Sequence, residues 1–415
     1  MPSEIVELRG HIIDSLILPK VLDEILTRGG TFKIADIKIG QNRADQSHAR
    51  IELSAASDEK LAEILLRLRQ HGAEVIERKE VQLAPAPANG VFPFDFYVTT
   101  NQQTFLQVAG HEVAVDSPMI DSAIAVNREK GTARSVKFCD VRQGDQIVVG
   151  QQGIRVQAAQ RDPSPTSPFQ LNASISAETP KSGIIRALAR EFRRIRAKQG
   201  KIVVVAGPSV VHTGAGMHLE KLIALGYVQR LFTGNGLAVY DIESAIYGTS
   251  LGVNLERGEQ ADAGRENHMH AINRMRATGG IAAAVAQKVL TRGIMHACVT
   301  HNVDIVLSGS IRDDGPIPGV TTDALEAQRI MREKLRDVTL VLMMGSMLHS
   351  IAVVNMVPAS VKIVCVDIDS RAVMRLTSQQ VFQAIGLVTD LEPFLRELTD
   401  RLEKPESDPN DSAAA

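Results

Sequence analysis

The second half of the chain alternates short apolar runs with amphipathic segments. Continuous apolar runs are typical of strands that are buried on both faces, and apolar positions three and four apart indicate helices. The expected strands are 202–206, 228–233, 303–308, 338–343 and 361–367. The expected helices are 216–225, 241–247, 266–278, 281–291, 323–335, 346–354 and 391–402. The alternation predicts an α/β domain, residues 182–404, with a Rossmann-like parallel sheet covered by helices on both faces.

A different pattern fills residues 1–83. Strand-like runs and two amphipathic helices follow one another in the order β-α-β-β-α-β. The expected strands are 5–12, 31–39, 49–54 and 73–77, and the expected helices are 18–26 and 58–70. This order predicts a ferredoxin-like α+β domain.

Composition divides the rest of the chain. The Pro- and Ala-rich residues 84–90 read as a linker, and residues 90–160 read as a small β module with many short strands. Its expected strands are 94–99, 104–108, 112–115, 133–138, 146–149 and 154–156. Residues 161–181, rich in Pro, Ser and Thr, read as a second linker, and residues 405–415 as a disordered tail.

Composition also excludes several classes of protein. The 415 residues carry a formal net charge of −2, and 4% of them are aromatic, with no Trp. This argues against nucleic-acid binding. No apolar run has the length of a membrane span, and no signal peptide is expected at the start. The three cysteines are far apart, which fits a reducing cytoplasm and argues against a Cys-x-x-Cys metal site. A cytoplasmic protein without a metal site is therefore expected.

The stretch 201–216 carries the first chemical signal. The apolar run 202–206 breaks at Gly207-Pro208 and passes through Thr213-Gly214-Ala215-Gly216 into an amphipathic segment. A strand, a glycine-rich turn and a helix can hold a pyrophosphate, because backbone N–H groups and the helix N-terminus favour negative charge. The spacing is not the common G-x-G-x-x-G, and a plain strand-to-helix turn is the alternative.

Four more predicted strands end in unusual polar or glycine residues. Because the carboxyl ends of parallel strands meet at one edge of the sheet, this convergence predicts a nucleotide site there. The expected cofactor-binding residues are Gly207, Pro208, His212, Thr213, Gly214, Ala215, Gly216, Gly234, Asn235, Ser308, Gly309, Gly345, Ser346, Asp367 and Ile368. Gly309 and Gly345 would let the backbone approach a dinucleotide.

Asp367 bears on which cofactor binds. It ends the fifth predicted strand, where a carboxylate can accept hydrogen bonds from an adenosine ribose and would repel a 2′-phosphate. This favours NAD over NADP. In the alternative, Asp369 or Ser370 caps a helix and Asp367 is merely exposed.

Candidates for the chemistry lie at the same strand ends. They are Asn235, Asp241, Glu243, Asn267, His268, Arg312, Asp313, Asp314 and His349. Arg312 could clamp a carboxylate, and a carboxylate could hold an ammonium group or move protons. Each also has a structural alternative: Asp241 suits a helix N-cap, Asp313-Asp314-Gly315 suits a turn, and His212 and His349 suit buried strand ends.

Several of these segments together resemble a known family. They are VVAGPSVVHTGAG (204–216), GNGLAVYDIE (234–243), YGTSLGVNL (247–255), VLSGSIRDDG (306–315), MLHSIAV (347–353) and PASVKIVCVD (358–367). Over nearly its whole length the chain is similar to the family of the lysine-ketoglutarate reductase/saccharopine dehydrogenase conserved region. That family includes archaeal-type NAD-dependent ornithine cyclodeaminases and the C-terminal part of cyanobacterial arginine-degrading enzymes that make proline.

The resemblance implies an NAD domain of the deoxyhypusine synthase/sirtuin type. It implies conversion of L-ornithine to L-proline and ammonia, by oxidation with NAD, cyclisation and re-reduction. We expect Arg312 to bind the carboxylate, and Asp241, Asp313 and Asp314 to bind the ammonium and transfer protons. Second-rank candidates are Asn235 and His349.

Other functions stay open. A sirtuin-like or deoxyhypusine synthase-like transferase is disfavoured, because the chain has three unpaired cysteines and no lysine at a predicted glycine-rich strand end after residue 226. Another NAD-dependent amino-acid or amine oxidoreductase would share the cofactor site. A sensor would bind NAD and an amino acid without turnover. Folds of this kind often form homo-oligomers, which is the assembly we expect.

Overall fold

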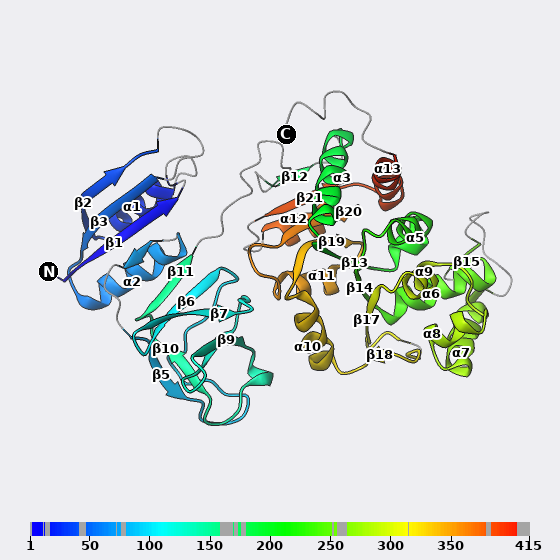
Figure 1. Cartoon of the computed structure of the whole chain (residues 1–415), viewed down its shortest axis with the longest axis horizontal. Helices are drawn as coiled ribbons and strands as arrows, with labels where there is room; N and C mark the ends of the chain where they lie inside the picture. Colours follow the sequence, from blue (N-terminus) through cyan, green and yellow to red (C-terminus); the bar gives the residue numbers. More distant parts are fainter. Residues whose placement is uncertain are drawn as a thin grey trace. The chain divides into compact units, whose positions relative to one another are not determined.

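The computed structural model describes residues 2–10, 12, 17–40, 47–71, 73–75, 80–157, 169, 173–175, 180–250, 253–254, 264–313, 315–378 and 383–404. The chain forms two compact units, Met1–Gln160 and Arg161–Ala415 (Figure 1). Most of the predicted second linker, the predicted tail and Asp314 lie outside the described residues. None of the helices in the described ranges is long and apolar enough to cross a membrane.

The first unit begins with a four-stranded antiparallel sheet in the order β2-β3-β1-β4. Its elements are β1 (Ser3–Gly10), α1 (Ile17–Thr27), β2 (Thr31–Lys38), β3 (Ser47–Ser54), α2 (Asp58–Gln70) and β4 (Glu74–Val75). Alternate residues of β3, among them Ile51 and Leu53, are buried with Val21 and Ile64 of the two helices. The ferredoxin-like prediction is confirmed.

A seven-stranded sheet completes this unit, in the order β11-β6-β7-β9-β8-β10-β5. Its strands are β5 (Gln82–Pro85), β6 (Gln103–Val108), β7 (His111–Asp116), β8 (Ala123–Asn127), β9 (Thr132–Val136), β10 (Gln146–Val149) and β11 (Ile154–Gln157). Two expectations are wrong. The predicted linker 84–90 begins inside β5, which pairs with β10, and the predicted strand 94–99 is no strand, because only Phe96 forms a single bridge, to Val149.

The second unit is built on an eight-stranded sheet in the order β12-β21-β20-β19-β13-β14-β17-β18, in which every pair is parallel. Its strands are β12 (Ala173–Ile175), β13 (Lys201–Ala206), β14 (Arg230–Gly234), β17 (Asp304–Ser308), β18 (Val320–Thr321), β19 (Val338–Met344), β20 (Lys362–Asp367) and β21 (Ala384–Val388). The five predicted strands are present, and the Rossmann-like prediction is confirmed. β13 lies in the middle, and the chain leaves it first toward β14 and later returns to β19 on its other side.

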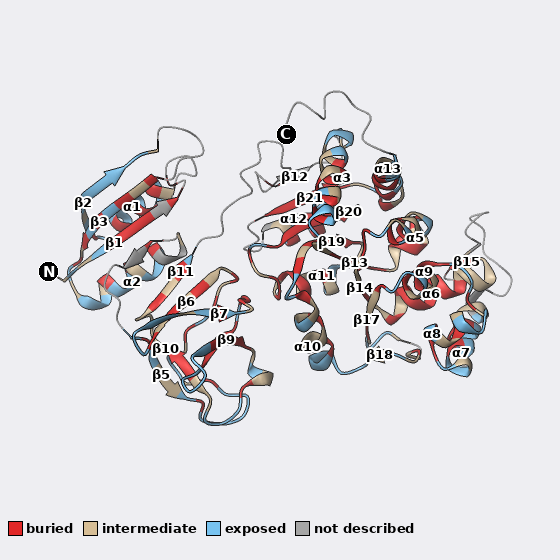
Figure 2. Ribbon diagram, viewed as in Figure 1, coloured by how far each residue is buried: buried red, intermediate tan, exposed pale blue. Residues whose placement is uncertain are grey.

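Helices cover both faces of this sheet. The strands of this sheet are largely buried (Figure 2). Ile202 and Val204 of β13 belong to one core cluster, and Val203 and Val205, which point the other way, belong to a second cluster. The first cluster holds side chains of α3 (Ser182–Ala197), α5 (Gly216–Ala224), α6 (Asn235–Tyr247), α7 (Gly264–Thr278), α8 (Ile281–Ala286), α9 (Ile294–Thr300) and α13 (Leu391–Glu403). The second holds side chains of α10 (Ala324–Leu335), α11 (Met347–Val354) and α12 (Ser370–Ser378).

Some predicted boundaries differ from the structure. Helix α6 begins at Asn235, six residues before its predicted start, and follows β14 directly. Helix α8 ends at Ala286 and a separate α9 follows, where one helix to residue 291 was expected. The short α4 (Ser209–His212), α12 and β21 were not predicted.

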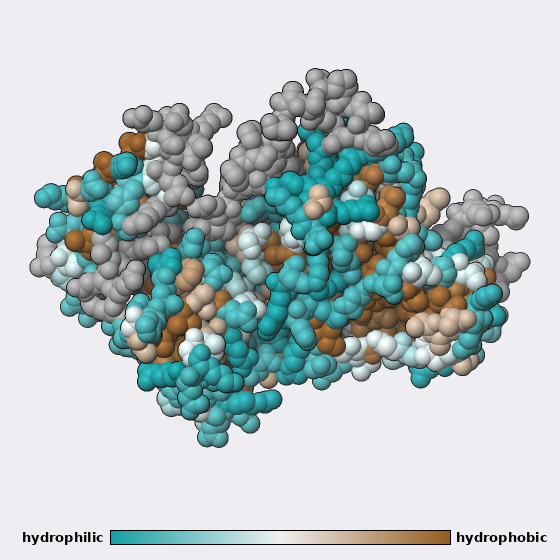
Figure 3. Space-filling model, in the orientation of Figure 1, coloured by the Kyte–Doolittle hydropathy of each residue, from teal (hydrophilic) through white to brown (hydrophobic). Residues whose placement is uncertain are grey.

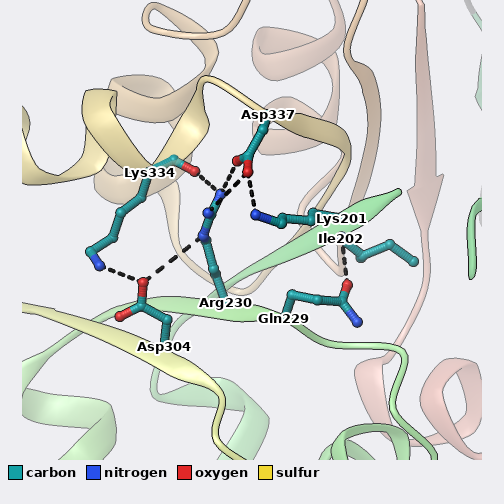
Figure 4. A network of polar contacts seen from close by, with 7 residues as sticks. All are labelled: Lys201, Ile202, Gln229, Arg230, Asp304, Lys334 and Asp337. Carbon is teal, nitrogen blue, oxygen red and sulfur yellow. Dashed lines mark hydrogen bonds and ion pairs between the residues drawn. The ribbon is translucent and has the colours of Figure 1, made fainter. Parts of the chain in front are cut away.

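Charged residues tie the strands together at the amino edge of the sheet (Figure 4). The Arg230 guanidinium pairs with Asp337 and donates to the carbonyl oxygen of Lys334. Asp337 also pairs with Lys201, and Lys334 with Asp304. Arg230 and Lys201 lower the pKa of Asp337 to about 2. Asp337 is half exposed, so solvent weakens the pairing. A hollow of about 180 Å³ also lies at this edge, which is the edge opposite to the predicted site.

Candidate functional site

The turns after β13 and β19 touch where the chain changes direction across the sheet. A Cβ built on Gly207 would lie 1.9 Å from the Gly345 carbonyl oxygen, and one on Gly345 would lie 1.8 Å from Ser209 Oγ. Ser209 Oγ donates to the Gly345 carbonyl oxygen over 3.3 Å. In open α/β sheets the crevice at such a switch point binds ligands. The two glycines therefore bring the two halves of this crevice together.

Gly309 and Gly345 pack closely against neighbouring segments of the chain. Gly309 donates its N–H to the Thr321 carbonyl oxygen over 2.8 Å, and a Cβ built on it would lie 3.1 Å from Thr322 Cα. Gly345 has a φ of +59° and packs against Ser209. The neighbouring chain therefore fills the space that a side chain would need at both positions, and the approach of a dinucleotide to these glycines stays a prediction.

Helices that follow the central strands begin without side-chain caps. Gly234 before α6, Ser346 before α11 and Ala215 before α5 form no capping hydrogen bond through a side chain. At the nearby α13, by contrast, Asp390 accepts a hydrogen bond from the Glu392 N–H. Uncapped helix N-termini attract anions. The edge around β13, β14 and β19 therefore has the chemistry of a phosphate site.

The predicted Thr213–Gly216 turn joins α4 to α5. Gly214 has a φ of +78°, in the left-handed region, and a Cβ there would meet nothing within 4 Å. Thr213 is exposed, and Ala215 is buried in the core. The turn is thus open on the side of Thr213 and Gly214, and closed where Ala215 anchors it.

Asp367 ends β20 at the same edge. Its Oδ1 accepts the Asp369 N–H over 2.9 Å, while Asp369 accepts the N–H and the side chain of Arg371 at the start of α12. Ile368 between them is 73% exposed. The helix is therefore capped by Asp369, as the alternative had it, and Asp367 is partly exposed at the strand end.

Exposed apolar side chains occur beside several of these strand ends. They are Met217, Ile311, Leu348 and Ile368. A single exposed apolar residue needs no explanation. Several at the ends of different strands offer flat contacts for the rings of a nucleotide.

His349 and Asp313 lie close together over the ends of β14 and β17. A Cβ built on Gly234 would be 3.1 Å from His349 Cε1 and 3.6 Å from the Ser308 carbonyl oxygen. His349 Nδ1 lies 2.9 Å from Ser346 Oγ. Burial lowers the pKa of His349, and the negative charge of Asp313 acts against this. His349 is thus a largely neutral imidazole near a carboxylate, which suits proton transfer.

Arg312 lies on an exposed turn beside this pair. Asp313 Oδ2 accepts the Ser310 N–H over 2.8 Å, and Ser310 Oγ accepts the Arg312 N–H over 3.1 Å. These contacts close a turn at 310–313, whereas the turn expected at 313–315 includes Asp314, which lies outside the described residues. The turn at 310–313 is stabilised by Asp313 and Ser310. It holds Arg312 exposed at the strand end.

Asn235 is buried and bonded to backbone. Its Oδ1 accepts the Ile317 N–H over 3.1 Å, and its Nδ2 donates to the Gly315 carbonyl oxygen at 3.5 Å. It therefore fixes the loop that follows the Arg312 turn. This contact makes Asn235 a positioning residue.

Asp241 caps a helix. Its Oδ1 and Oδ2 accept the N–H groups of Ile294 and Met295, each over 2.8 Å, at the start of α9. The side chain is buried, and a Cβ on Gly293 would lie 2.9 Å from its Oδ2. The prediction that Asp241 binds a substrate ammonium is corrected, because both oxygens point at this helix.

The capping carboxylate makes stability depend on pH. Burial raises the pKa of Asp241 from 3.8 to about 7. Between these values the folded chain holds a proton that the unfolded chain has released, so stability falls as pH rises. We expect the stability of the wild type relative to Asp241→Asn to fall by on the order of 2 kcal/mol between about pH 5 and about pH 8. Urea unfolding of both proteins at each pH measures this, and a difference independent of pH would contradict it.

A second group of polar side chains joins α4, α6 and α7. His212 Nδ1 lies 2.8 Å from Ser250 Oγ, and the ring centroids of His212 and Tyr240 are 4.8 Å apart. Tyr240 also stacks on His268, with centroids 4.9 Å apart, and His268 Nδ1 lies 3.3 Å from Glu243 Oε2. We call these four residues, His212, Tyr240, Glu243 and His268, the α6 cluster.

Only one member of the α6 cluster, His212, was predicted in the cofactor site. Glu243 and His268 were weighed as candidates for the chemistry, but the sequence did not show that they meet. The spacing of Tyr240 and Glu243 by three residues does place them on one face of α6. Among the described residues no three His, Cys, Asp or Glu side chains form a group that could hold a metal ion.

The fold and the site define a class: an α/β protein of the Rossmann type with uncapped helix N-termini at the carboxyl edge of its parallel sheet. Known families cover most of the chain. Residues 186–398 match the C-terminal Rossmann fold of ArgZ-like arginine dihydrolases, residues 103–185 match the first region of that C-terminal part, and residues 3–102 match the conserved region of the LOR/SDH bifunctional enzyme.

A full-length relative belongs to the same family. The chain is 45% identical over 409 residues to an ornithine cyclodeaminase of Methanocaldococcus jannaschii, with 97% of each chain covered. It therefore belongs to the ornithine cyclodeaminase family with the LOR/SDH conserved region.

Two solved structures of cyanobacterial relatives are similar. ArgZ, an arginine dihydrolase from the ornithine–ammonia cycle in cyanobacteria, is 36% identical, with a TM-score of 0.81 over 97% of this chain and 58% of that one. A ternary complex of AgrE with ornithine and NAD+ is 38% identical, with a TM-score of 0.54 over 98% of this chain and 58% of that one. AgrE of Nostoc sp. is a bifunctional arginine dihydrolase/ornithine cyclodeaminase.

Proposed function

We propose that this chain is an ornithine cyclodeaminase, which converts L-ornithine to L-proline and ammonia with NAD as a cofactor that is regenerated in each turnover. The observation that carries the proposal is the 45% identity to an archaeal ornithine cyclodeaminase over 97% of both chains. The complex of AgrE, a related protein, with ornithine and NAD+ supports both ligands.

The residues at the crevice fit a dinucleotide. The uncapped N-terminus of α5, with the open turn at Gly214, would hold the pyrophosphate. Asp367 would accept hydrogen bonds from the adenosine ribose, and Ile368 would lie against the base. When bound, NAD+ supplies an acceptor for a hydride and afterwards returns it.

The substrate's charged groups need partners in the same crevice. We propose that Arg312 binds the carboxylate, since a guanidinium can donate two parallel hydrogen bonds to it. Asp313, beside it, would attract an ammonium group. Asp314, which lies outside the described residues, stays a prediction for the same role. His349 and the buried Asn235 would position this turn and the loop after it.

A direct assay tests the function. Purified protein receives L-ornithine and a catalytic amount of NAD+, and proline, ammonia and NADH are followed together. We expect proline and ammonia in equal amounts and no net NADH. Net NADH without proline would instead indicate an ordinary amino-acid dehydrogenase. NAD binding without any turnover would favour a sensor.

Replacement of Asp367 tests the cofactor. We expect Asp367→Ser to weaken NAD+ binding by about tenfold to a hundredfold, because a charge-assisted hydrogen bond to the ribose is lost. Binding of NADP+ should improve relative to NAD+, since a negative charge is removed from the place of its 2′-phosphate. Titration calorimetry with both cofactors measures the two affinities.

The matched control for this replacement is Asp369→Ser. Asp369 caps α12 and pairs with Arg371, so its loss should lower stability and leave the ratio of the two affinities unchanged. An equal change of the ratio in both variants would argue against a role of Asp367 in cofactor choice.

We also propose that the chain forms a homo-oligomer. Apolar side chains gather on the surface of the second unit over α6 and α9 (Figure 3). Partly buried hydrophobic residues there include Ile246 and Val299. Light scattering on the purified protein measures the assembly.

A further inference from the structure

The α6 cluster has the composition of an acid–base group. Its one carboxylate, Glu243, is fully buried, and Oε1 accepts the Thr249 hydroxyl over 2.8 Å. Oε2 faces His268 Nδ1 at 3.3 Å. A buried carboxylate behind one ring nitrogen of a histidine orients the imidazole and stabilises its protonated form. His268 itself is only partly buried.

The cluster lies at the crevice. Helix α6 starts directly after β14, and a Cβ built on Gly236 in its first turn would lie 3.7 Å from the Tyr240 ring and 3.8 Å from Pro208. The Tyr240 ring contacts His212 of α4, the short helix that follows β13. His268 packs on the other side of the Tyr240 ring.

Thr249, Ser250 and Asn267 also hydrogen-bond to the α6 cluster or to one another and hold it in place. The Thr249 hydroxyl, which donates to Glu243, also accepts Asn267 Nδ2 over 3.1 Å. Ser250, beside His212, is buried like Thr249. A network with fixed partners gives the preorganised geometry that proton transfer needs.

We propose that His268, oriented by Glu243, is the group that takes a proton from the substrate's α-ammonium in the proposed cyclodeaminase reaction. The inference rests on that function. Its chemistry requires such a group, because a protonated amine has no electron pair to release when the hydride leaves its carbon. Asp241, the carboxylate expected from the sequence, is occupied in the cap of α9.

Protons and electrons balance over the proposed reaction. One N–H bond of the α-ammonium breaks, its electron pair stays on nitrogen, and the proton passes to the His268 imidazole. The hydride leaves the α-carbon for NAD+, and the distal ammonium loses a proton to solvent and adds as an amine to the resulting iminium. A proton then passes from the new ring nitrogen to the former α-amine, which leaves as ammonia and takes up the proton that His268 held. After the hydride has returned to the α-carbon, the ring nitrogen of proline takes a proton from solvent. Glu243 touches no reacting atom and is a positioning residue.

Titratable groups of α4 and α6 lie near His268. Among the described residues these are Glu243 and Tyr240 of α6, with His212 behind the Tyr240 ring. Burial lowers the pKa of His212, and the charge of Glu243 opposes this. Glu243→Gln therefore also lowers the pKa of His212 further, whereas His268→Gln leaves the charge of Glu243 in place.

The test compares two histidines of the same helix. His268→Gln should lower kcat by about a hundredfold to ten-thousandfold, which is the range of general acid–base catalysis. His270→Gln is the matched control, because His270 is exposed on α7 and should leave kcat unchanged. NAD+ affinity and the melting temperature are measured for both. Equal kcat values for the two variants, with proline formed, would overturn the inference and leave the proposed function standing.

Glu243→Gln keeps a hydrogen-bonding side chain and removes only the charge. The amide cannot orient the His268 ring as the carboxylate does, so kcat should fall while KM and NAD+ affinity stay near those of the unsubstituted chain. A fall of NAD+ affinity and melting temperature in step with kcat would mean a purely structural role and would overturn the inference. If the unsubstituted chain forms no proline, the proposed function itself fails, and the inference fails with it.

Discussion

Gly207→Ala is expected to destabilise the second unit by about 3 kcal/mol or more and to abolish cofactor binding. A methyl group at this position would lie 1.9 Å from the Gly345 carbonyl oxygen and 2.6 Å from its carbon, and both are backbone atoms that no rotamer change can move. The turns after β13 and β19 would have to separate by more than an ångström. Since this contact forms the floor of the proposed crevice, its loss affects binding as well as stability. Urea unfolding and NAD+ titration measure the two effects.

Gly216→Ala is the matched control. Gly216 begins α5 in the same glycine-rich stretch, but a Cβ there would lie 3.7 Å from the nearest atom, Ile294 Cδ1, an ordinary contact. Its stability should stay within about 1 kcal/mol of the wild type, because alanine also favours the helix. An unchanged stability of Gly207→Ala would show that the two turns can move apart freely, which would contradict the close contact as a determinant of the fold.

The parallel sheet could be predicted because its strands are buried on both faces. Residues 202–206 and 340–343 are continuous apolar runs, and no amphipathic helix has that pattern. The run 384–388 has the same pattern and forms β21, but Gly386 in its middle weakens the signal. The start of α6 was predicted too late, because Gly234-Asn235-Gly236 has the composition of a turn. Asn235 and Gly236 are nevertheless helical, since Leu237 and Ala238 pack in the core beside the sheet.

The location of the site was predictable, and the roles within it were less so. Strand ends share one edge in any parallel sheet, so the crevice follows from the order of elements. From the sequence, Asp241 could equally be a ligand or the cap of its own helix. In the structure it caps α9, more than 50 residues later in the chain. No local pattern encodes such a contact. The pairing of Glu243 with His268 likewise depends on how α6 and α7 pack.

Glu191→Leu is expected to lower the free energy of unfolding by about 3 to 5 kcal/mol. Lys362 Nζ lies 2.9 Å from Glu191 Oε1, and their side chains are only 8% and 5% exposed. Without the carboxylate, the ammonium of Lys362 would stay buried against the Phe169 ring, whose centroid is 5.3 Å from Nζ. Urea unfolding of the variant measures the loss.

Lys362→Met should lower the free energy of unfolding less than Glu191→Leu does. The difference between the two variants tests whether an unpaired buried charge causes the loss. In Lys362→Met the carboxylate of Glu191 keeps Arg194, whose Nε donates to Oε2 over 2.9 Å, so its charge stays partly compensated. In the double variant no buried charge of the pair remains, and its loss should be several kcal/mol smaller than the sum of the two single losses. Additive losses would mean that α3 and β20 are held together by packing alone. A double variant close to the wild type would mean that the pair orients α3 on the sheet without stabilising the fold.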